Sequence, residues 1–295
     1  MKSTKYKFPY YRSDIDGLRG YAVIFVVLYH YSFLNFGGGF LGVDIFFVIS
    51  GYLITSLISR DLNNNSFSVT NFFHRRIKRI IPLLLIVILI TSFLSYILLL
   101  PKDLKDYSRS GISSLFFFSN IYFYFRADYF DSYAIMKPLL HTWSLSIEEQ
   151  YYLFYPLLFL IFYNKYKKLL IFIIFTLFIM SVGSYFYKFN NNFYSSFYLG
   201  HNRFWEIFLG CLIFFIPKFN LIKNKYFIYA LEFINLILFS LLLLICIFFN
   251  SILFEISIIT FVVTILTSII IYINNYQLKT KIIYSNKFLQ YLGIR

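Results

Sequence analysis

Charged residues are scarce in this sequence of 295 residues. Asp, Glu, Lys and Arg make up only 14% of it, and hydrophobic residues make up 59%. An average soluble domain is nearer a quarter charged. Uncharged runs extend over Leu83–Leu100, Phe233–Phe254 and Ile256–Ile273, and about 20 such residues are enough for a helix to cross the hydrocarbon layer of a membrane. The composition therefore excludes an ordinary soluble enzyme and indicates a multi-pass membrane protein.

Cysteine is almost absent, and acidic residues are few. The two cysteines, Cys211 and Cys246, lie in apolar runs without CxxC spacing, which argues against a disulfide framework and against a metal site. The 27 Lys and Arg residues outnumber the 13 Asp and Glu residues and give a formal net charge of +14. These basic residues lie in short loops and form no continuous stripe. We therefore expect topology signals and contacts with anionic membrane lipids, and no nucleic-acid partner.

The apolar runs predict an all-α, polytopic transmembrane helical bundle in which residues 1–295 form a single domain. No small-residue cleavage site follows the lysines near the N-terminus, so we expect the first run to stay as a membrane anchor. About eight crossings are expected, at residues 18–35, 41–59, 80–100, 142–162, 169–187, 199–216, 227–249 and 256–273.

A ninth apolar stretch, residues 107–125, is expected to be re-entrant or interfacial. If it returns to the side from which it entered, four basic loops all face the cytoplasm, as the positive-inside rule requires. These loops are Arg60–Arg79, Lys165–Lys168, Lys218–Lys225 and Lys279–Arg295. A full crossing would move two of them to the other side. The chain is therefore placed in the cell membrane with its N-terminus in the cytoplasm.

Polar residues inside the first two expected spans are candidate site residues, because a charge at the bilayer centre costs about 2.5–3.5 kcal/mol on insertion scales. His30 lies about 15 Å along the helix from Gly20 at about 1.5 Å per residue. It is either a hydrogen-bonded packing residue or a general base. Asp44 either complements a helix N-terminus or orients His30. Gly51, and Gly210 in a later span, are expected to allow close helix packing.

A basic cluster opens the span that begins near residue 80. Arg75, Arg76 and Arg79 lie there with Lys78, and Arg76 and Arg79 share a helix face because they are three residues apart. One interpretation is cytoplasmic anchoring. The other is a phosphate site, because arginine forks bind phosphate oxygens in pairs and a helix N-terminus adds to the attraction. We favour the phosphate site.

A second polar cluster begins the span at 142–162. His141, Ser144 and Glu148 follow one helical stripe, and Glu149 lies about 100° around the helix from Glu148. Adjacent carboxylates inside an apolar span need partners or protons, although His141 is also compatible with an interfacial belt.

Another such pair opens the span at 199–216. Arg203 and Glu206 are three residues apart, and they either pair with each other or reach Glu148 and Glu149. Basic groups thus collect on the expected inner side and the other candidates on the outer side. This sorting suits a phosphorylated cytoplasmic donor and an outward acceptor.

Several of these segments together resemble the membrane acyltransferase-3 family, whose members O-acetylate bacterial surface polysaccharides and related acceptors. The resemblance is clear over about residues 14–215, and its motifs occur in the family's order. The segments that carry it are Asp16–Gly20 with His30, Gly42–Tyr52, Arg75–Pro82, His141–Tyr152 and Arg203–Glu206.

The resemblance implies an acyl-CoA co-substrate, usually acetyl-CoA, that enters from the cytoplasm, and a surface glycan or lipid-linked saccharide as acceptor. It also implies a key histidine at His30 and a functional arginine pair at Arg76 and Arg79. The expected roles are then catalytic for His30, Asp44, Glu148 and Glu149, donor-binding for Arg75, Arg76 and Arg79, and acceptor-binding for His141, Ser144, Arg203 and Glu206.

Family members often have about ten spans, and the last pair follows a Tyr-Leu-Gly-like segment. This sequence stops at Tyr291–Arg295, so the family's last helices are expected to be missing. Two other functions stay open. One is a transporter or flippase that uses intramembrane His and Glu as a proton relay, although we find no internal repeat of the kind that transporters often show. The other is an inactive shortened relative.

Overall fold

The computed structural model describes residues 12–31, 37–126, 137–217, 225–249, 255–276, 278, 280–284 and 286–294. Within these ranges the regular structure is entirely helical. The chain divides into two compact units: the first comprises Met1–Ser56 and Glu206–Arg295, and the second comprises Leu57–Trp205. Each unit is described by itself. The basic loop expected at Lys218–Lys225, up to residue 224, and residues 32–35 of the first expected span lie outside the described residues.

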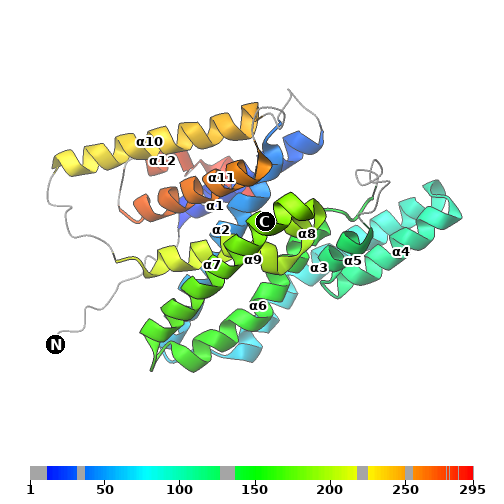
Figure 1. The fold of residues 1–295 in the computed structure, drawn as a ribbon, viewed down its shortest axis with the longest axis horizontal. Helices are drawn as coiled ribbons and strands as arrows, with labels where there is room; N and C mark the ends of the chain where they lie inside the picture. The colour runs from blue at the N-terminus through cyan, green and yellow to red at the C-terminus, as the bar shows by residue number, and fades with distance from the viewer. Residues whose placement is uncertain are drawn as a thin grey trace. The chain divides into compact units, whose positions relative to one another are not determined.

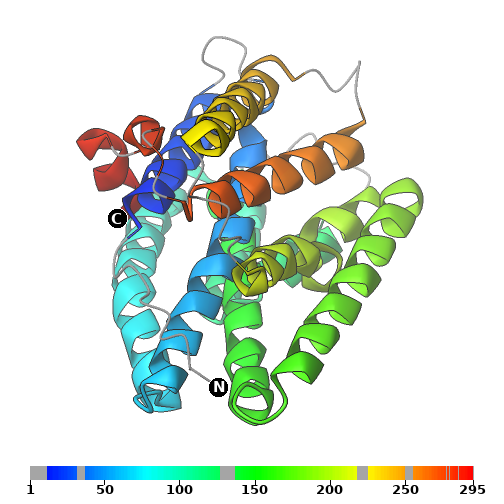
Figure 2. The same cartoon turned by 90° about the vertical axis from the view of Figure 1, so that its left-hand side faces the viewer.

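The first unit is built from both ends of the chain (Figure 1). It contains α1 (Ser13–His30), η2 (Gly39–Leu41), the first part of α2 (Gly42–Asn63), the last part of α9 (Gly200–Phe215), α10 (Lys225–Phe248), α11 (Ile256–Ile273), α12 (Lys281–Tyr284) and α13 (Lys287–Ile294). Helix α1 packs against α12, α13 and η2, and α10 packs against α11. The crossing of α10 over α11 can be followed in Figure 2.

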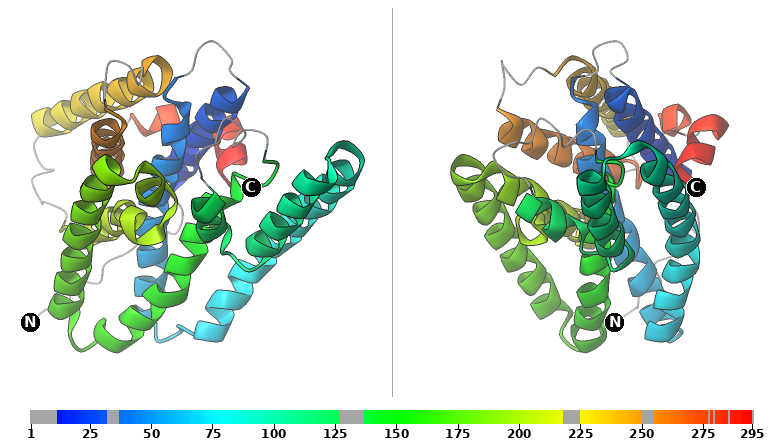
Figure 3. Two further views of the ribbon diagram at one scale, coloured as in Figure 1. Left: turned by 45° about the vertical axis from the view of Figure 1, so that its right-hand side comes forward. Right: turned by 90° about the vertical axis from the view of Figure 1, so that its right-hand side faces the viewer.

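The second unit is the middle of the chain. It contains the rest of α2, α3 (Val69–Leu98), α4 (Pro101–Leu115), α5 (Ser119–Arg126), α6 (Thr142–Phe162), α7 (Lys167–Asn191), α8 (Phe193–Tyr198) and the first part of α9. Helix α4 folds back along α3, and α5 packs on both α4 and α6 (Figure 3).

Five described helices are long and apolar enough to cross a membrane, over Gly39–Asn63, Val69–Leu98, Lys167–Asn191, Tyr226–Phe248 and Ile256–Ile273. The expected number of eight spans is therefore not confirmed. The other three expected spans correspond to α1, α6 and α9, which carry several of the polar candidate residues. Helix α1 contains Asp14, Asp16 and Arg19, α6 contains two glutamates, and α9 is only 16 residues long. The expected bounds 142–162 and 256–273 agree with α6 and α11.

The stretch at 107–125 is not one straight helix. Helix α4 ends at Leu115 and α5 begins at Ser119, and Phe117 between them has a φ of 57°. A bulky residue rarely adopts a positive φ, so the surrounding structure must hold it there. The Gln150 side chain does so in part, because its Nε2 donates to the Phe117 carbonyl at 2.9 Å. This interruption is compatible with a re-entrant or interfacial stretch, while the return to the same membrane side stays a prediction.

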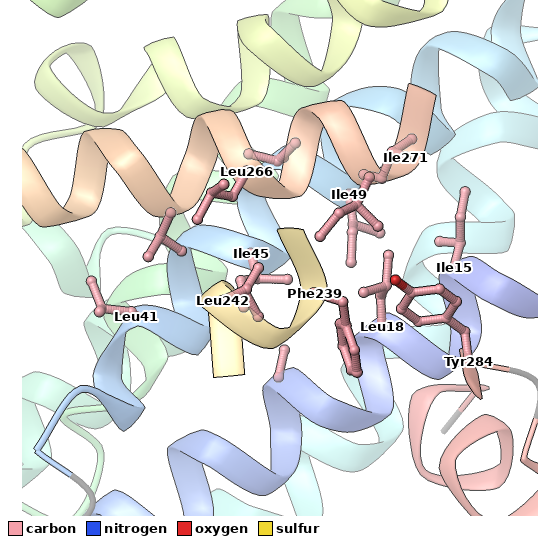
Figure 4. Close-up of a cluster of buried hydrophobic side chains, with 14 of the residues drawn as sticks. Ile15, Leu18, Leu41, Ile45, Ile49, Phe239, Leu242, Leu266, Ile271 and Tyr284 are labelled. Atoms are coloured by element: carbon pink, nitrogen blue, oxygen red, sulfur yellow. The ribbon is translucent and has the colours of Figure 1, made fainter. Parts of the chain in front are cut away.

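The apolar core of the first unit lies between α1, α2, α10 and α11 (Figure 4). Ile15 and Leu18 of α1 pack there with Ile45 and Ile49 of α2. These pairs are three and four residues apart, so each helix presents one face to the shared core. This packing holds the two helices that carry His30 and Asp44.

Glycines bring α1 unusually close to the C-terminal helices. A Cβ atom on Gly17 would lie 1.7 Å from the Tyr284 carbonyl oxygen, and one on Gly20 would lie 2.2 Å from that of Leu289. In the other direction, a Cβ on Gly293 would lie 1.9 Å from the Asp16 carbonyl oxygen. Small residues permit this kind of backbone approach between membrane helices. Gly293 near the end of α13 therefore packs closely on Asp16 of α1.

The close packing expected at Gly51 and Gly210 is confirmed. A Cβ on Gly51 would lie 1.9 Å from the Ile207 carbonyl oxygen, and one on Gly210 would lie 2.0 Å from that of Val48. The two helices α2 and α9 therefore cross in the first unit with a glycine on each side.

A polar network ties the start of α1 to the ends of other helices. The Arg12 guanidinium donates to both Asp14 carboxylate oxygens, at 2.8 and 2.6 Å, to the Tyr52 hydroxyl at 2.9 Å, and to the Asn275 side chain. Burial disfavours the charged form of Arg12, but the hydrogen bonds and charge interactions with Asp14 and Tyr52 together outweigh it and raise the pKa of Arg12 above its usual value. Arg12 thus stays charged and anchors α1 to α2 and to the turn after α11.

Candidate active site

His30 lies at the C-terminal end of α1 with an exposed side chain. Its Nδ1 atom is 2.7 Å from the carbonyl oxygen of Val26, one turn earlier. A carbonyl oxygen can only accept, so we assign the ring proton to Nδ1. In the neutral ring the lone pair then belongs to Nε2. This tautomer suits a general base that takes a proton at Nε2.

Asp44 lies in the first turn of α2 and is almost fully buried. Its carboxylate is within electrostatic range of the Cys246 thiol. The structure gives the Val26 carbonyl as the partner of His30 Nδ1, so a backbone group orients the ring at that atom. A further effect of Asp44 on His30 stays a prediction.

The three arginines near the start of α3 have different surroundings. Helix α3 begins after Ser68, whose hydroxyl accepts from the Asn71 N–H at 3.4 Å, a long capping bond. About two turns later, Arg75 forms an ion pair with Asp61 at 3.2 Å, and Arg79, about three turns after Ser68, is exposed.

Arg76 points toward α6. Its guanidinium carbon lies 4.2 Å from the centre of the Tyr152 ring and 5.8 Å from that of Phe72. In the part of the chain that the structure describes, Arg76 is half-buried and makes no ion pair and no side-chain hydrogen bond. A guanidinium has five N–H donors along its edge. The cation–π contact uses none of these donors in a hydrogen bond, so they are available to a phosphate.

The two glutamates of α6 lie beside this arginine. The Tyr152 hydroxyl donates to Glu148 Oε2 at 3.4 Å, a long hydrogen bond between residues four apart. Glu149 is half-buried, and its Oε1 atom is buried without a hydrogen-bond partner, while the charge of Arg76 acts on this carboxylate. From the sequence we expected Arg76 and the glutamates on opposite sides, but the fold brings them to one place in the second unit.

The remaining candidates lie around other parts of the molecule. Arg203 is buried, and its guanidinium carbon is within 6.0 Å of the ring centres of Trp143, Tyr185 and Phe197. His141 is exposed just before α6 begins, and its carbonyl accepts from the Ser144 hydroxyl at 3.3 Å. In the first unit, Glu206 is fully buried.

Several polar residues of α6 received no role in the sequence analysis. Ser146 and Ser119 are joined through their hydroxyls at 2.7 Å, and Gln150 donates to the Asn120 side chain at 2.8 Å. Together with the bond from Gln150 to Phe117, these contacts attach the α4–α5 break to α6. The spacing of Ser146 and Gln150, four residues apart in an apolar helix, could have indicated a shared polar face.

A metal site is not found among the described residues, where no group of three or more His, Cys, Asp or Glu side chains could hold an ion. The candidate groups placed above are an exposed imidazole, two neighbouring carboxylates of α6 and the Arg76 guanidinium.

A protein-family model described as an acyltransferase domain matches residues 12–293. The chain belongs to this acyltransferase family. The match includes every candidate residue named above and spans both compact units. Membership explains why motifs far apart in the sequence occur together, and it agrees with the resemblance noted from the motifs.

Two relatives of this chain are considerably longer than the chain itself. The chain is 40% identical over 227 residues to O-acetyltransferase OatA of Staphylococcus aureus, covering 73% of this chain and 36% of that protein. It is 38% identical over 225 residues to peptidoglycan O-acetyltransferase OatA of Listeria monocytogenes, covering 74% of this chain and 36% of that protein. The chain thus spans little more than a third of the length of these relatives. No solved structure matches it.

Proposed function

We propose that this protein transfers an acetyl group from cytoplasmic acetyl-CoA to a hydroxyl of an extracytoplasmic glycan, and that peptidoglycan is the acceptor to test first. Membership of the acyltransferase family supports group transfer. Relatives named O-acetyltransferase and peptidoglycan O-acetyltransferase support the acetyl group and the acceptor. The orientation with the N-terminus in the cytoplasm rests on the positive-inside rule.

The observation that carries the donor site is Arg76. Its neighbour Arg75 is already paired with Asp61, whereas the Arg76 donors have no partner among the described residues. Arginine forks bind phosphate oxygens through paired, charge-assisted hydrogen bonds. Arg76 therefore binds a CoA phosphate, and Arg79, one turn further along α3, adds a second positive charge.

The base of the reaction is His30. Its Nε2 takes the proton from the acceptor hydroxyl as the hydroxyl oxygen attacks the thioester carbonyl. The new C–O bond forms, the C–S bond breaks, and the CoA thiolate leaves with the proton that the imidazolium returns. The Val26 carbonyl favours this direction of proton transfer because it keeps Nδ1 protonated. Arg203 and Glu206 are assigned to the acceptor side, whereas Glu148 and Glu149 lie beside Arg76 and are assigned to the donor site.

The test is the content of base-labile O-acetyl esters in cell-wall glycan from intact cells. Cells that carry the wild-type gene should contain these esters, and cells without the gene or with His30→Ala should lack them. His74→Ala is the matched control, because His74 is also an exposed histidine but lies on α3. This control should keep the esters.

Two results would contradict the proposal. Wild-type ester content with His30→Ala would remove the role of His30 as base. Unchanged esters in cells without the gene, together with movement of a solute that needs no acetyl-CoA, would favour the transporter interpretation instead.

A further inference from the structure

We infer that Tyr152 is a positioning residue that holds Arg76 in the orientation needed to bind the acyl donor, and that its ring and its hydroxyl act on different parts of the site. The inference rests on the proposed function of Arg76. The observation behind it is that one fully packed side chain on α6 contacts both the donor arginine and a candidate carboxylate.

The ring is the part that acts on Arg76. Tyr152 is 2% exposed, so its position is fixed by the surrounding packing. Its ring centre lies 4.2 Å from the Arg76 guanidinium carbon, well within the distance of about 6 Å at which a cation–π contact is favourable. The guanidinium lies over this ring and makes no hydrogen bond or ion pair among the described residues, so its N–H donors stay available. The long, flexible Arg76 side chain is then already ordered in the free protein, so phosphate binding loses less conformational entropy.

The charge of Glu149 offers Arg76 a competing partner. That carboxylate is within electrostatic range of Arg76, yet no ion pair joins the two residues among the described contacts. A closed ion pair would consume the donors that a phosphate needs. The Tyr152 ring therefore keeps Arg76 close to the carboxylate without closing the pair.

The hydroxyl is the part that acts on Glu148. It donates at 3.4 Å, which is longer than the usual distance of about 2.7 Å for a bond between oxygen atoms. We therefore expect the hydroxyl to affect Glu148 only weakly, and to leave Arg76 unaffected. A single residue thus offers two substitutions with separate effects.

The experiment measures the dissociation constant of CoA with the purified full-length protein in detergent. Tyr152→Leu removes the ring and should weaken CoA binding about tenfold, which corresponds to about 1.4 kcal/mol. Tyr152→Phe keeps the ring and should bind CoA within about twofold of the wild type, while glycan ester content falls modestly. Arg76→Gln should weaken CoA binding at least as much as Tyr152→Leu.

The matched control is Tyr155→Leu. Tyr155 is also a buried tyrosine of α6, but its ring stacks on Tyr151 at a centre distance of 4.6 Å and packs tilted against Phe159 at 4.7 Å. Tyr155→Leu should lower the melting temperature about as much as Tyr152→Leu does, but it should still bind CoA like the wild type. It thereby separates loss of a packed ring from loss of the contact with Arg76.

The outcomes separate this inference from the proposed function. If Arg76→Gln weakens CoA binding and Tyr152→Leu does not, the positioning role is wrong and the donor site stands. If Tyr152→Phe binds CoA as weakly as Tyr152→Leu, the ring is not the acting group and the inference fails. If Arg76→Gln leaves CoA binding unchanged, the proposed donor site itself is wrong.

Discussion

The close packing of α1 on the C-terminal helices makes a quantitative prediction for Gly17→Ala. The new Cβ would lie 1.7 Å from the Tyr284 carbonyl oxygen, whereas real Cβ contacts essentially never fall below 3.0 Å. The two backbones would have to separate by about 1.3 Å, the difference between these distances. Because the neighbour is backbone, no rotamer change can relieve the clash.

The expected net cost is about 2 kcal/mol. Overpacking costs about 1–3 kcal/mol, and a backbone clash belongs at the upper end of that range. Replacing a helical glycine by alanine stabilises the folded state by about 1 kcal/mol through helix propensity and offsets part of this cost. At about 2–4 °C per kcal/mol for larger domains, the apparent melting temperature should fall by about 4–8 °C. We expect surface-ester content to fall as well, because α1 carries His30.

The assay is thermal unfolding of the purified protein in detergent, with Gly183→Ala as the control. Gly183 is also inside a long helix, α7, but a Cβ there would meet nothing within 4 Å. That variant should melt at the wild-type temperature or slightly above it, through propensity alone. A Gly17→Ala protein that melts at the wild-type temperature would refute the close approach of α1 to α12.

Two further predictions concern the second unit. The native cysteines are buried, so single cysteines at the exposed positions Ser108 and Asn164 can be labelled selectively in intact cells. Ser108→Cys should react with a membrane-impermeant maleimide and Asn164→Cys should not. If the 107–125 segment is re-entrant, α6 is the one crossing between the two positions, and they lie on opposite sides of the membrane. The same response at both positions would indicate that 107–125 crosses fully. Gln150→Leu should destabilise the protein by about 1–3 kcal/mol, because it leaves the Phe117 carbonyl without this donor, and hydrogen exchange should rise most at residues 116–120. Unchanged exchange at these residues would show that Gln150 does not hold the break.

The sequence by itself determined the class of the protein and its family. Uncharged runs of this length indicate membrane-spanning helices, because a helix pairs its backbone N–H and C=O groups internally where no water is present. The expected spans at about 142–162 and 256–273 agree with the bounds of α6 and α11. The few polar residues within or beside the apolar segments indicated the candidate site, because a charged side chain inside a membrane span is energetically costly. The small residues Gly51 and Gly210 likewise indicated close packing, which the fold contains.

Only the tertiary structure decided which of those residues meet. From the sequence, Arg75, Arg76 and Arg79 were predicted to form one phosphate site, but Asp61 pairs with Arg75 while Arg76 turns to Tyr152. The sequence also predicted Arg76 and Glu149 on opposite membrane sides, but the two side chains lie close together. Charge bias estimates the membrane side of a residue, but it gives no information about the contact between α3 and α6. Local periodicity reports which face of a helix a side chain occupies. Which neighbour fills that face depends on packing between segments far apart in the chain, and that packing is fixed only when the whole fold forms.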